Sequence, residues 1–577
     1  MRKYIQFLCI GFLFISCKTG SGKLIKNNSI DQIQLSRVEA MPNLPEPFKI
    51  MDFKGMAKKF DALVYDETQT GAYWPLIWSD NSRKNFDQET FGIYTAMGDL
   101  RQGPEHHDGI FHESLATVGS VFGATLVGID KSNQNGKNYV SMLKNYFNSE
   151  THWDIVMNNT SPEVAMLGGG YGRDWWYDVY PNVLFYGLAN FYPEEKDYTE
   201  IMRSVAEKFY EADAVLAGNY SYSFFDYARL EPKDNWICKQ EDAAAGHAYV
   251  LYSAYQKFNE PKYLAAAKSS LETLLAQEDN RFYEILMPFG AYVAVRLNAE
   301  EGTTYDYTKI LEWTFNGTSV CREGWGVLVD NWNGYDVSGI VGSTVDHGGF
   351  GFLMNTYDTM WPLVPMVRYD QRYANTIGKW MLNASNALKL FYPYEMPDEH
   401  QSIPELKHHT KGVIAYEGLI KRSHFEAYDH INAPIAIGDG PHWVEGNPDV
   451  SQFSVYGSGH VGIAGAIISK TNVDNILQLD LLATDFYRDA AFPSYLYYNP
   501  NSEIRAVTIS VGEKSLKIYD AIQRTFLKEK VKGSFTFNIS KENSALLVMV
   551  PQNASVSEKN GKLYADGVVI DYRYSEN

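Results

Sequence analysis

The chain has 577 residues and a formal net charge of −19, and aromatic residues make up 14% of it. This length allows one very large domain or two to three ordinary ones. The acidic balance argues against a nucleic-acid partner, because phosphates bind to basic surfaces, although a local cationic pocket could still hold a small anion. The 41 Tyr and 12 Trp suit stacking on sugar rings, but a large aromatic core would have the same composition.

The N-terminus carries a targeting signal. A short basic start precedes the apolar run Tyr4–Ile15, which is too short to span a membrane and is typical of a secretory signal. The sequence Phe14-Ile15-Ser16-Cys17 resembles a bacterial lipobox, with Phe in place of the usual Leu. The resemblance implies a signal peptide over 1–16, lipidation (palmitate) at Cys17 and an outer-membrane lipoprotein facing the periplasm. The alternative is an ordinary secretory signal with an unmodified Cys17. Polar residues 17–45 are expected to form a tether.

Two kinds of helical pattern alternate between residues 46 and 490. A helix that is apolar on most faces is typical of a buried position, and one with a charged face lies outside. The apolar kind occurs at Gly109–Val127, Trp175–Phe191, Ala243–Phe258, Tyr283–Leu297, Phe350–Val367 and Val461–Ile468. The charged kind occurs at Gly136–Asn148, Lys196–Leu216, Pro261–Gln277, Tyr305–Phe315, Arg372–Phe391 and Asp474–Phe486. The order of inner and outer segments resembles an (α/α)6 toroid. A helical solenoid with a short fixed repeat is the alternative.

Residues 491–577 change to runs rich in Val, Ile, Tyr and Phe, separated by Gly, Asn and Lys turns. The expected strands are Glu503–Val511, Ser515–Tyr519, Gly533–Ile539, Ser544–Val550 and Lys562–Tyr572. The predicted fold is therefore mainly α, an (α/α)6 toroid followed by a C-terminal antiparallel β-sandwich.

Two long connections, 316–349 and 392–460, interrupt the helical rhythm, and loops of this length inside a domain are usually functional. The second holds more than half of the chain's 13 histidines: His400, His408, His409, His424, His430, His442 and His460. No HExxH, CxxC or His-x-His motif occurs, so neither a metal nor another cofactor is predicted, although a metal assembled from distant loops stays open. Cys238 and Cys321 could pair in an oxidising compartment.

The segment Gly168–Tyr177 opens the second inner helix with four glycines, which let the backbone approach a ligand closely. The Arg173 guanidinium suits a carboxylate or sulfate, and a helix N-terminus adds positive potential. Asp174, Trp175 and Trp176 would complete a substrate-binding site. The alternative is a tight turn with Arg173 paired to Asp174.

Three further positions are candidates on the inner helices. His247 lies about one turn into the third helix, where a hydrogen-bonded core histidine is the alternative. His347 has glycine beside it in Ser343–Gly351, which opens the fifth helix. Tyr357 follows on that helix and could act as a base if nearby cations lowered its pKa.

The combination of toroid, β-rich tail, aromatic excess and lipoprotein signal resembles carbohydrate-active lipoproteins of Bacteroidota polysaccharide utilisation systems. The nearest layout is that of the uronate lyases and the ulvan oligosaccharide dehydratase. The resemblance implies a carbon–oxygen lyase, either a dehydratase at the non-reducing end of uronate oligosaccharides or a polysaccharide lyase. It also implies an acidic oligosaccharide substrate and other enzymes of the same degradation pathway as partners.

Elimination next to a uronate carboxylate needs a base, an acid and groups that hold the developing charge. The predicted catalytic residues are His247, Tyr357 and His409, and the predicted substrate-binding residues are Arg173, Asp174, Trp175, Trp176, His347 and His460. One alternative is a glycoside hydrolase with a carboxylate pair. Its carboxylates would come from Asp174, Glu241, Asp242 and Asp358. A non-catalytic glycan-binding lipoprotein is the other alternative.

Overall fold

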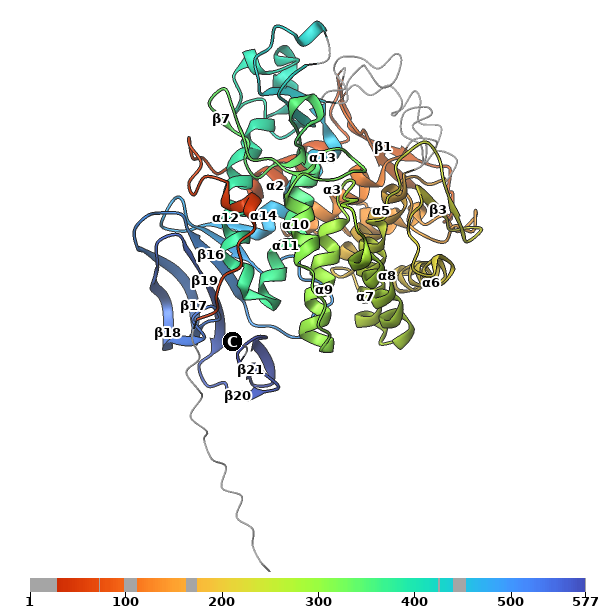
Figure 1. Ribbon diagram of the computed structural model, residues 1–577. Coiled ribbons are helices and arrows are strands. Elements are labelled where there is room, and N and C mark those ends of the chain that lie inside the picture. Colours follow the sequence, from red (N-terminus) through yellow and green to blue (C-terminus); the bar gives the residue numbers. More distant parts are fainter. Residues whose placement is uncertain are drawn as a thin grey trace, which may run out of the picture.

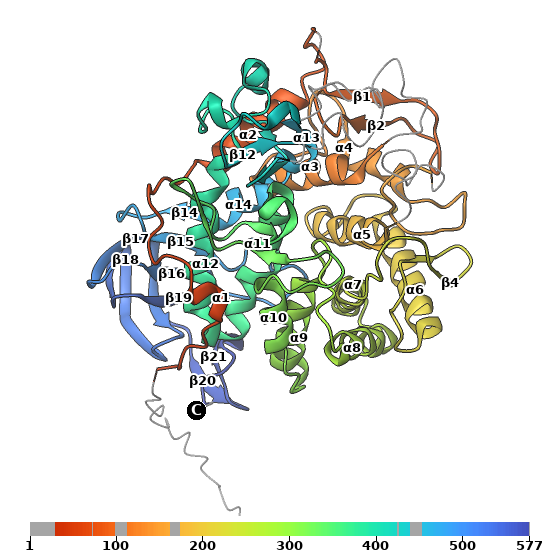
Figure 2. The same cartoon turned by 45° about the horizontal axis from the view of Figure 1, so that its top comes forward.

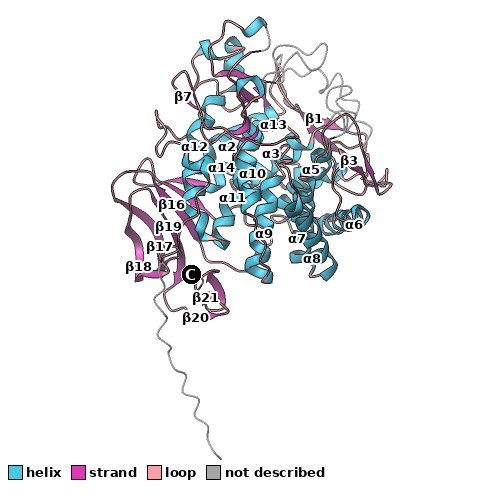
Figure 3. Ribbon diagram, in the orientation of Figure 1, coloured by secondary structure: helices cyan, strands magenta, loops and turns pink. Residues whose placement is uncertain are grey.

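The computed structural model describes residues 29–71, 73–97, 112–161, 174–423, 426–438 and 453–575. A helical body carries antiparallel sheets at its C-terminal side (Figures 1 and 3). One continuous hydrophobic core runs through the helices and reaches the C-terminal sheets. None of the helices in the described ranges is both long and apolar enough to cross a membrane.

The described inner helices pack in a closed cycle (Figure 2). They are α3 (Ser114–Leu126), α5 (Trp175–Ala189), α7 (Ala243–Phe258), α9 (Met287–Glu301), α11 (Leu353–Tyr369), α13 (Val455–Gly459) and α14 (Val461–Ile467). Each packs against the next, and α13 and α14 return to α3. Their apolar all-round pattern explains this position, since every residue of α11 is buried.

Outer helices flank this cycle. They are α2 (Phe53–Val64), α4 (Tyr139–Met142), α6 (Tyr198–Leu216), α8 (Pro261–Ala276), α10 (Thr308–Phe315) and α12 (Ala374–Ala387). The turn between α7 and α8 shows how the sequence sets the alternation. Asn259 ends α7 in the left-handed conformation, and Pro261 starts α8 in its first turn.

Residues 29–45 pack against the body, which differs from the tether predicted over 17–45. The short helix α1 (Ser36–Glu39) packs against α12. Ile33 N donates to the Arg372 carbonyl at 2.7 Å, and Val38 is fully buried. The tether prediction is wrong for 29–45, because the apolar residues between its polar ones are buried against α12 and the C-terminal sheet.

The main C-terminal sheet is antiparallel, with the strand order β14-β15-β16-β19-β17-β18. Its strands are β14 (Ile468–Lys470), β15 (Leu477–Asp480), β16 (Ser494–Asn499), β17 (Arg505–Asp520), β18 (Thr525–Ile539) and β19 (Asn543–Pro551). A smaller sheet consists of β20 (Val556–Lys559), β21 (Lys562–Ala565) and β22 (Val568–Asp571). Strands are thus confirmed in the region where the sequence predicted them.

One predicted outer helix is wrong. Asp474–Phe486 contains β15 followed by a turn, so the sheet begins at Ile468 rather than at 491. The reason is tertiary, because β15 pairs on both sides, with β14 and β16. The outer position that this segment was expected to fill is taken by α2, which packs on α14.

The two long connections form a sheet together, with the strand order β12-β11-β9-β8-β5. Its strands are β5 (Trp325–Val327), β8 (Val341–Ser343), β9 (Phe350–Phe352), β11 (Gly418–Ile420) and β12 (Ile435–Ile437). Since β9 runs directly into α11, this sheet lies at the N-terminal end of that inner helix. The remaining strands are β1 (Ile77–Asp80), β2 (Thr90–Ile93), β3 (Phe224–Asp226), β4 (Glu231–Lys233), β6 (Asn331–Trp332), β7 (Tyr335–Asp336), β10 (Ala415–Tyr416) and β13 (Phe453–Ser454).

Candidate active site

Polar side chains from the N-terminal ends of α5, α7, α9 and α11 meet at one end of the helical cycle. Asp174 and Asp242 precede α5 and α7 directly, Glu284 lies shortly before α9, and Asn355 is in the first turn of α11. Contacts between successive members of this series show that these helix ends lie together: Tyr283 N donates to Asp242 Oδ2 at 3.0 Å, and Asn355 Nδ2 donates to Glu284 Oε2 at 2.7 Å. We call this end the mouth.

Asp174 is a buried carboxyl group with the properties of a proton donor. Its Oδ1 accepts a hydrogen bond of 2.5 Å from Gln240 Nε2, and Gln240 Oε1 accepts one from Trp176 N at 3.0 Å. Burial raises the pKa of Asp174 to about 7, against the opposing effects of Gln240 and the Arg322 charge. A carboxyl group with this pKa is partly protonated at neutral pH and can act as a general acid.

Glu284 is fixed by an ion pair and by hydrogen bonds. Its Oε1 forms an ion pair with Arg322, and Asn355 Nδ2 bonds both Oε2 and the Glu284 carbonyl, at 2.7 and 2.9 Å. The Arg322 guanidinium lies 3.8 Å from the centre of the Trp325 ring, and Trp325 Nε1 donates to the Glu284 carbonyl at 3.0 Å. These contacts stabilise the negative charge and fix its position.

Arg322 connects the two carboxyl groups. It pairs with Glu284 and also acts through its charge on Asp174. The mouth therefore combines a carboxyl group whose pKa is about 7 with a carboxylate that is ion-paired with Arg322. Two carboxyl groups with opposite environments are the arrangement that acid–base chemistry at neutral pH requires.

Buried polar atoms at the mouth lack partners. Among the described residues, Trp176 Nε1, Asp242 Oδ1 and Asn355 Oδ1 have no hydrogen bond. Buried polar atoms are nearly always bonded, so water or a polar ligand is needed to satisfy these. The ring of Trp176 lies 4.0 Å from that of Tyr177, which is partly exposed and adds an aromatic surface.

The site residues that the sequence analysis missed are Gln240, Glu284, Arg322 and Asn355. A local signal for Glu284 exists, because it is the single charged residue in Phe282–Val295. Arg322 and Asn355 have no such signal, since their role depends on contacts with a residue 38 and 71 positions away.

His247 and Trp175 belong to a structural cluster. The His247 ring is fully buried, with Tyr227 OH 2.7 Å from Nε2 and Tyr220 OH 3.1 Å from Nδ1. Burial lowers its pKa to about 3, so the imidazole is neutral. Trp175 Nε1 donates to the same Tyr227 hydroxyl at 3.0 Å. The structure thus places both residues in the core, the alternative weighed for His247, and their predicted functional roles gain no support from it.

The other predicted catalytic residues lie apart from His247. Tyr357 is fully buried, its hydroxyl is 2.9 Å from Tyr392 OH, and burial raises its pKa well above the usual tyrosine value. His409 lies in Pro404–Thr410, where its ring packs at 4.5 Å on Tyr73 and burial lowers its pKa. None of these three contacts another, so the structure does not assemble the predicted catalytic group.

The remaining predicted residues divide between described and undescribed parts of the chain. His347 is partly exposed, and its Nδ1 lies 3.3 Å from the carbonyl of Arg422, which follows strand β11. Arg173 and Cys17 lie outside the described residues. Their predicted roles in substrate binding and lipidation therefore stay predictions.

His460 forms a buried ion pair in the centre of the helical cycle. Its Nδ1 lies 2.6 Å from Asp358 Oδ1, and its Nε2 lies 2.9 Å from the Leu115 carbonyl. Both partners are acceptors, so the ring carries two protons. Burial alone would lower the pKa of His460, but Asp358 and the Leu115 carbonyl more than offset this and raise it. The pair links α3, α11 and α13, so the contacts of His460 stabilise the fold.

We expect this ion pair to make stability depend on pH. The folded protein holds the imidazole proton more tightly than the unfolded chain, so the stabilisation is fully present below the ordinary histidine pKa of about 6.5 and is lost as the pH rises through the raised folded value. His460→Gln should cost about 3–5 kcal/mol below pH 6.5, because Asp358 stays buried without its partner. Thermal unfolding of both proteins over this pH range measures the difference, and parallel pH profiles would contradict the assignment.

A disulfide lies beside the mouth. Cys238 and Cys321 are bonded, with their Cα atoms 5.5 Å apart, so the pairing left open by the sequence is present. Cys321 precedes Arg322, and Cys238 lies two residues before Gln240. In the described ranges no group of His, Cys, Asp and Glu side chains has the arrangement of a metal site.

No protein-family model and no curated protein matches the sequence. Among solved structures, the chain is similar to a GH127 β-L-arabinofuranosidase from Geobacillus stearothermophilus T6, with 9% identity, a TM-score of 0.32, and coverage of 90% of this chain and 85% of that one. A second GH127 β-arabinofuranosidase has 10% identity and a TM-score of 0.32, with 94% and 83% covered. An α-L-rhamnosidase from Dictyoglomus thermophilum has 11% identity and a TM-score of 0.32, with 80% and 48% covered.

At this low similarity, the likeness assigns neither a substrate nor a residue to this chain. The solved structures found are named as glycoside hydrolases and not as lyases, so the carbon–oxygen lyase class expected from the sequence is not borne out.

Proposed function

We propose that the protein is a glycoside hydrolase built on an (α/α)6 toroid, with Asp174 as general acid and Glu284 as the second catalytic carboxylate. The closed cycle of inner helices supports the toroid. The observation that carries the function is the carboxyl pair that shares Arg322, in which Asp174 has a pKa of about 7 and Glu284 is ion-paired. This is the hydrolase alternative left open by the sequence, with Glu284 as its new member.

The chemistry follows from the two protonation states. Asp174 donates its proton to the glycosidic oxygen, so the leaving sugar departs as a neutral alcohol. Glu284 acts at the anomeric carbon, either by direct attack or by taking a proton from the attacking water. The positive charge that develops on the sugar ring is stabilised by the carboxylate. Arg322 and Asn355 orient Glu284 and keep it charged between turnovers.

The described part of the mouth favours a neutral glycan. Asp174, Asp242 and Glu284 are buried there, and the charge of Arg322 is already paired with Glu284. A uronate carboxylate would have to compete with Glu284 for Arg322, whereas a neutral sugar would not. Tyr177, which is partly exposed and packs on the buried Trp176, provides a ring on which an uncharged sugar face can stack.

The predicted location is retained as part of the proposal. The Cys238–Cys321 disulfide is consistent with an oxidising compartment such as the periplasm, to which the N-terminal signal would direct the chain. Lipidation of Cys17 would then keep the enzyme at the outer membrane beside other enzymes of a glycan-degrading pathway.

Product analysis tests the function. We expect neutral oligosaccharides to be cleaved with uptake of one water per bond, seen by mass spectrometry, and with no gain in ultraviolet absorbance. Uronate oligosaccharides serve as the matched comparison, because elimination would create an absorbing conjugated double bond. Binding without cleavage across the whole neutral panel would refute the hydrolase and favour a glycan-binding protein.

A further inference from the structure

A groove opens at the opposite end of the helical cycle from the mouth, between the C-terminal end of α9 and the sheet β20–β22. It has two lobes of about 610 and 660 Å³, and Glu300, Glu301, Lys562 and Tyr572 line both. The first lobe adds Tyr255, Gln256, Asn259, Asp489 and Tyr564, and the second adds Asn298, Thr303, Tyr305 and Asn560. Cavities of this size accommodate sugar-sized ligands.

The wall between the lobes is fixed. Lys562 Nζ donates to the Ala299 carbonyl and lies 5.5 Å from the centre of the Tyr572 ring. Tyr572 in turn packs on Tyr369 of α11, with ring centroids 5.0 Å apart. These contacts join β21 and the end of β22 to α9 and α11, so the groove exists before any ligand binds.

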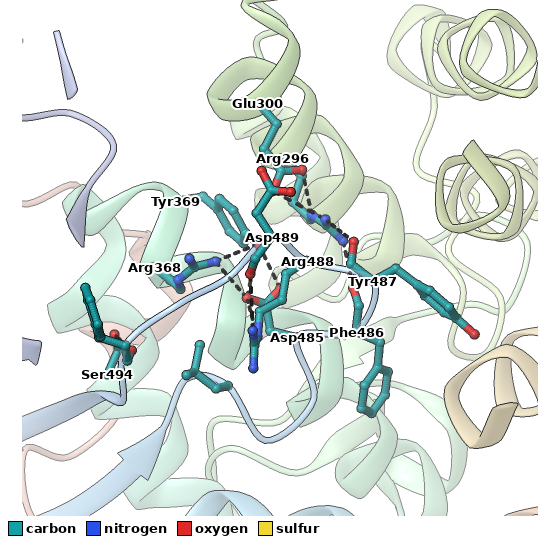
Figure 4. A network of polar contacts seen from close by, with 12 residues as sticks. Arg296, Glu300, Arg368, Tyr369, Asp485, Phe486, Tyr487, Arg488, Asp489 and Ser494 are labelled. Carbon is teal, nitrogen blue, oxygen red and sulfur yellow. Dashed lines mark hydrogen bonds and ion pairs between the residues drawn. The ribbon is translucent and has the colours of Figure 1, made fainter. Parts of the chain in front are cut away.

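A buried polar network lies beside the groove and includes Glu300, Tyr369 and Asp489 from its lining (Figure 4). Arg296 Nε donates to Glu300 Oε2 at 3.0 Å, and Arg296 Nη1 donates to the Phe486 carbonyl at 3.0 Å. Arg368 Nη1 bonds Asp485 Oδ2, also at 3.0 Å. The network fixes the segment from Asp485 towards Asp489 against α9 and α11, and Asp489 lines the first lobe.

The groove presents polar groups beside aromatic rings. Tyr255 and Tyr564 are half-buried, and neither hydroxyl has a hydrogen bond to another described residue. Amide side chains of Asn259 and Asn560 and the carboxylate of Asp489 stand beside them. Stacking surfaces combined with amide and carboxylate groups are suited to sugar hydroxyls.

The charges of the groove exclude other ligand classes. Four carboxylates line the groove: Glu300, Glu301, Asp370 and Asp489. They face two cations, Lys562, whose ammonium bonds the Ala299 carbonyl, and Arg573, which pairs with Asp370. Phosphates, sulfates and uronates would therefore meet net repulsion. The lining carries too many polar groups for a lipid chain, which needs an apolar cavity.

We propose that this groove is a second, non-catalytic binding site for neutral oligosaccharides, separate from the mouth. The shape of the groove sets the length of the ligand. An oligosaccharide that contacts both lobes must pass the Lys562–Tyr572 wall and therefore needs several sugar units. The site would hold a glycan on the enzyme while the mouth acts on another stretch of it. Binding here does not depend on hydrolysis at the mouth.

Calorimetric titration of the full chain tests the site. Neutral linear hexasaccharides of glucose, xylose and arabinose are the probes, and hexagalacturonate is the anionic comparison. The titrations use the Glu284→Gln background, so that the probe is not consumed. We expect Tyr255→Ala and Tyr564→Ala to weaken one binding event about ten-fold, since a stacking aromatic ring is removed. Tyr394→Ala, at a tyrosine that is 56% exposed and lies outside the groove, is the matched control and should change nothing.

A second variant covers the case in which the tyrosine variants fold poorly. Ala490 is exposed and lines the first lobe, so Ala490→Trp fills that lobe without removing a core contact. It should abolish the same binding event and leave the stoichiometry at the mouth unchanged. Unchanged affinity and stoichiometry in Ala490→Trp, or equal binding of hexagalacturonate, would overturn the proposal. A failure of hydrolysis alone would leave these titrations interpretable, because they measure binding.

Discussion

Asp174→Asn is expected to lower kcat by about 10²–10⁴-fold while KM changes little, because the variant keeps the shape of the side chain but has no proton to donate. A general acid works in its protonated form. Since the pKa of Asp174 is about 7, wild-type activity should therefore fall as the pH rises above about 7. The residual activity of the variant should lack this alkaline decline. Steady-state kinetics across pH measures both effects.

Asp242→Asn is the matched control for this experiment. Asp242 is also buried with a pKa of about 7, but its Oδ2 accepts a hydrogen bond from Tyr283 N, which an asparagine oxygen can still accept. Its kcat should stay close to that of the wild type. Loss of activity in Asp242→Asn together with normal activity in Asp174→Asn would transfer the role of acid to Asp242. Glu284→Gln should be about as inactive as Asp174→Asn, but through loss of the charged carboxylate.

Removal of the Cys238–Cys321 disulfide is expected to lower kcat about ten- to hundred-fold. The bond connects the loop that presents Gln240 to Asp174 with the loop that presents Arg322 to Glu284. Without it, both carboxyl groups lose part of their positioning, and a shift of about 1 Å can have an effect of this size. The double variant Cys238→Ser/Cys321→Ser should also lose up to about 4 kcal/mol of stability, because the closed loop is long.

Activity and stability can be separated in this experiment. Kinetics are measured well below the melting temperature of the double variant, so that unfolding does not contribute. Treatment with a reductant should lower kcat of the wild type and leave the double variant unchanged, which controls for effects of the reductant elsewhere. A double variant with wild-type kcat at low temperature would show that the disulfide stabilises the fold without positioning the site.

Most of the helices and strands named above could be predicted from local sequence patterns. Ala243–Phe258 was predicted as an inner helix and is α7 with the same limits, because its small and apolar residues surround the helix and Asn259 ends it. The strand prediction for 533–539 and 544–550 succeeded because β-rich runs are separated by short polar turns. Such patterns are local, so they can be read without knowledge of the partner segments.

The helix prediction for Asp474–Phe486 was wrong because the deciding contacts are not local. Its apolar spacing fits a helix, but its backbone pairs in the sheet between β14 and β16, and that pairing depends on segments that a local pattern does not contain. The tether prediction for residues 29–45 was wrong for the same reason. The few apolar residues of this segment are buried only because α12 and the C-terminal sheet offer a surface for them.

At the candidate site, some residues could be named from the sequence, but their roles depend on contacts that form only in the folded chain. Asp174 and Asp242 could be named from their positions before inner helices, but Glu284 and Arg322 become partners only when the helical cycle closes. His247 and His460 look alike in sequence. One is neutral between two tyrosines and the other is charged beside Asp358, because a histidine's protonation is set by the groups that fold around it.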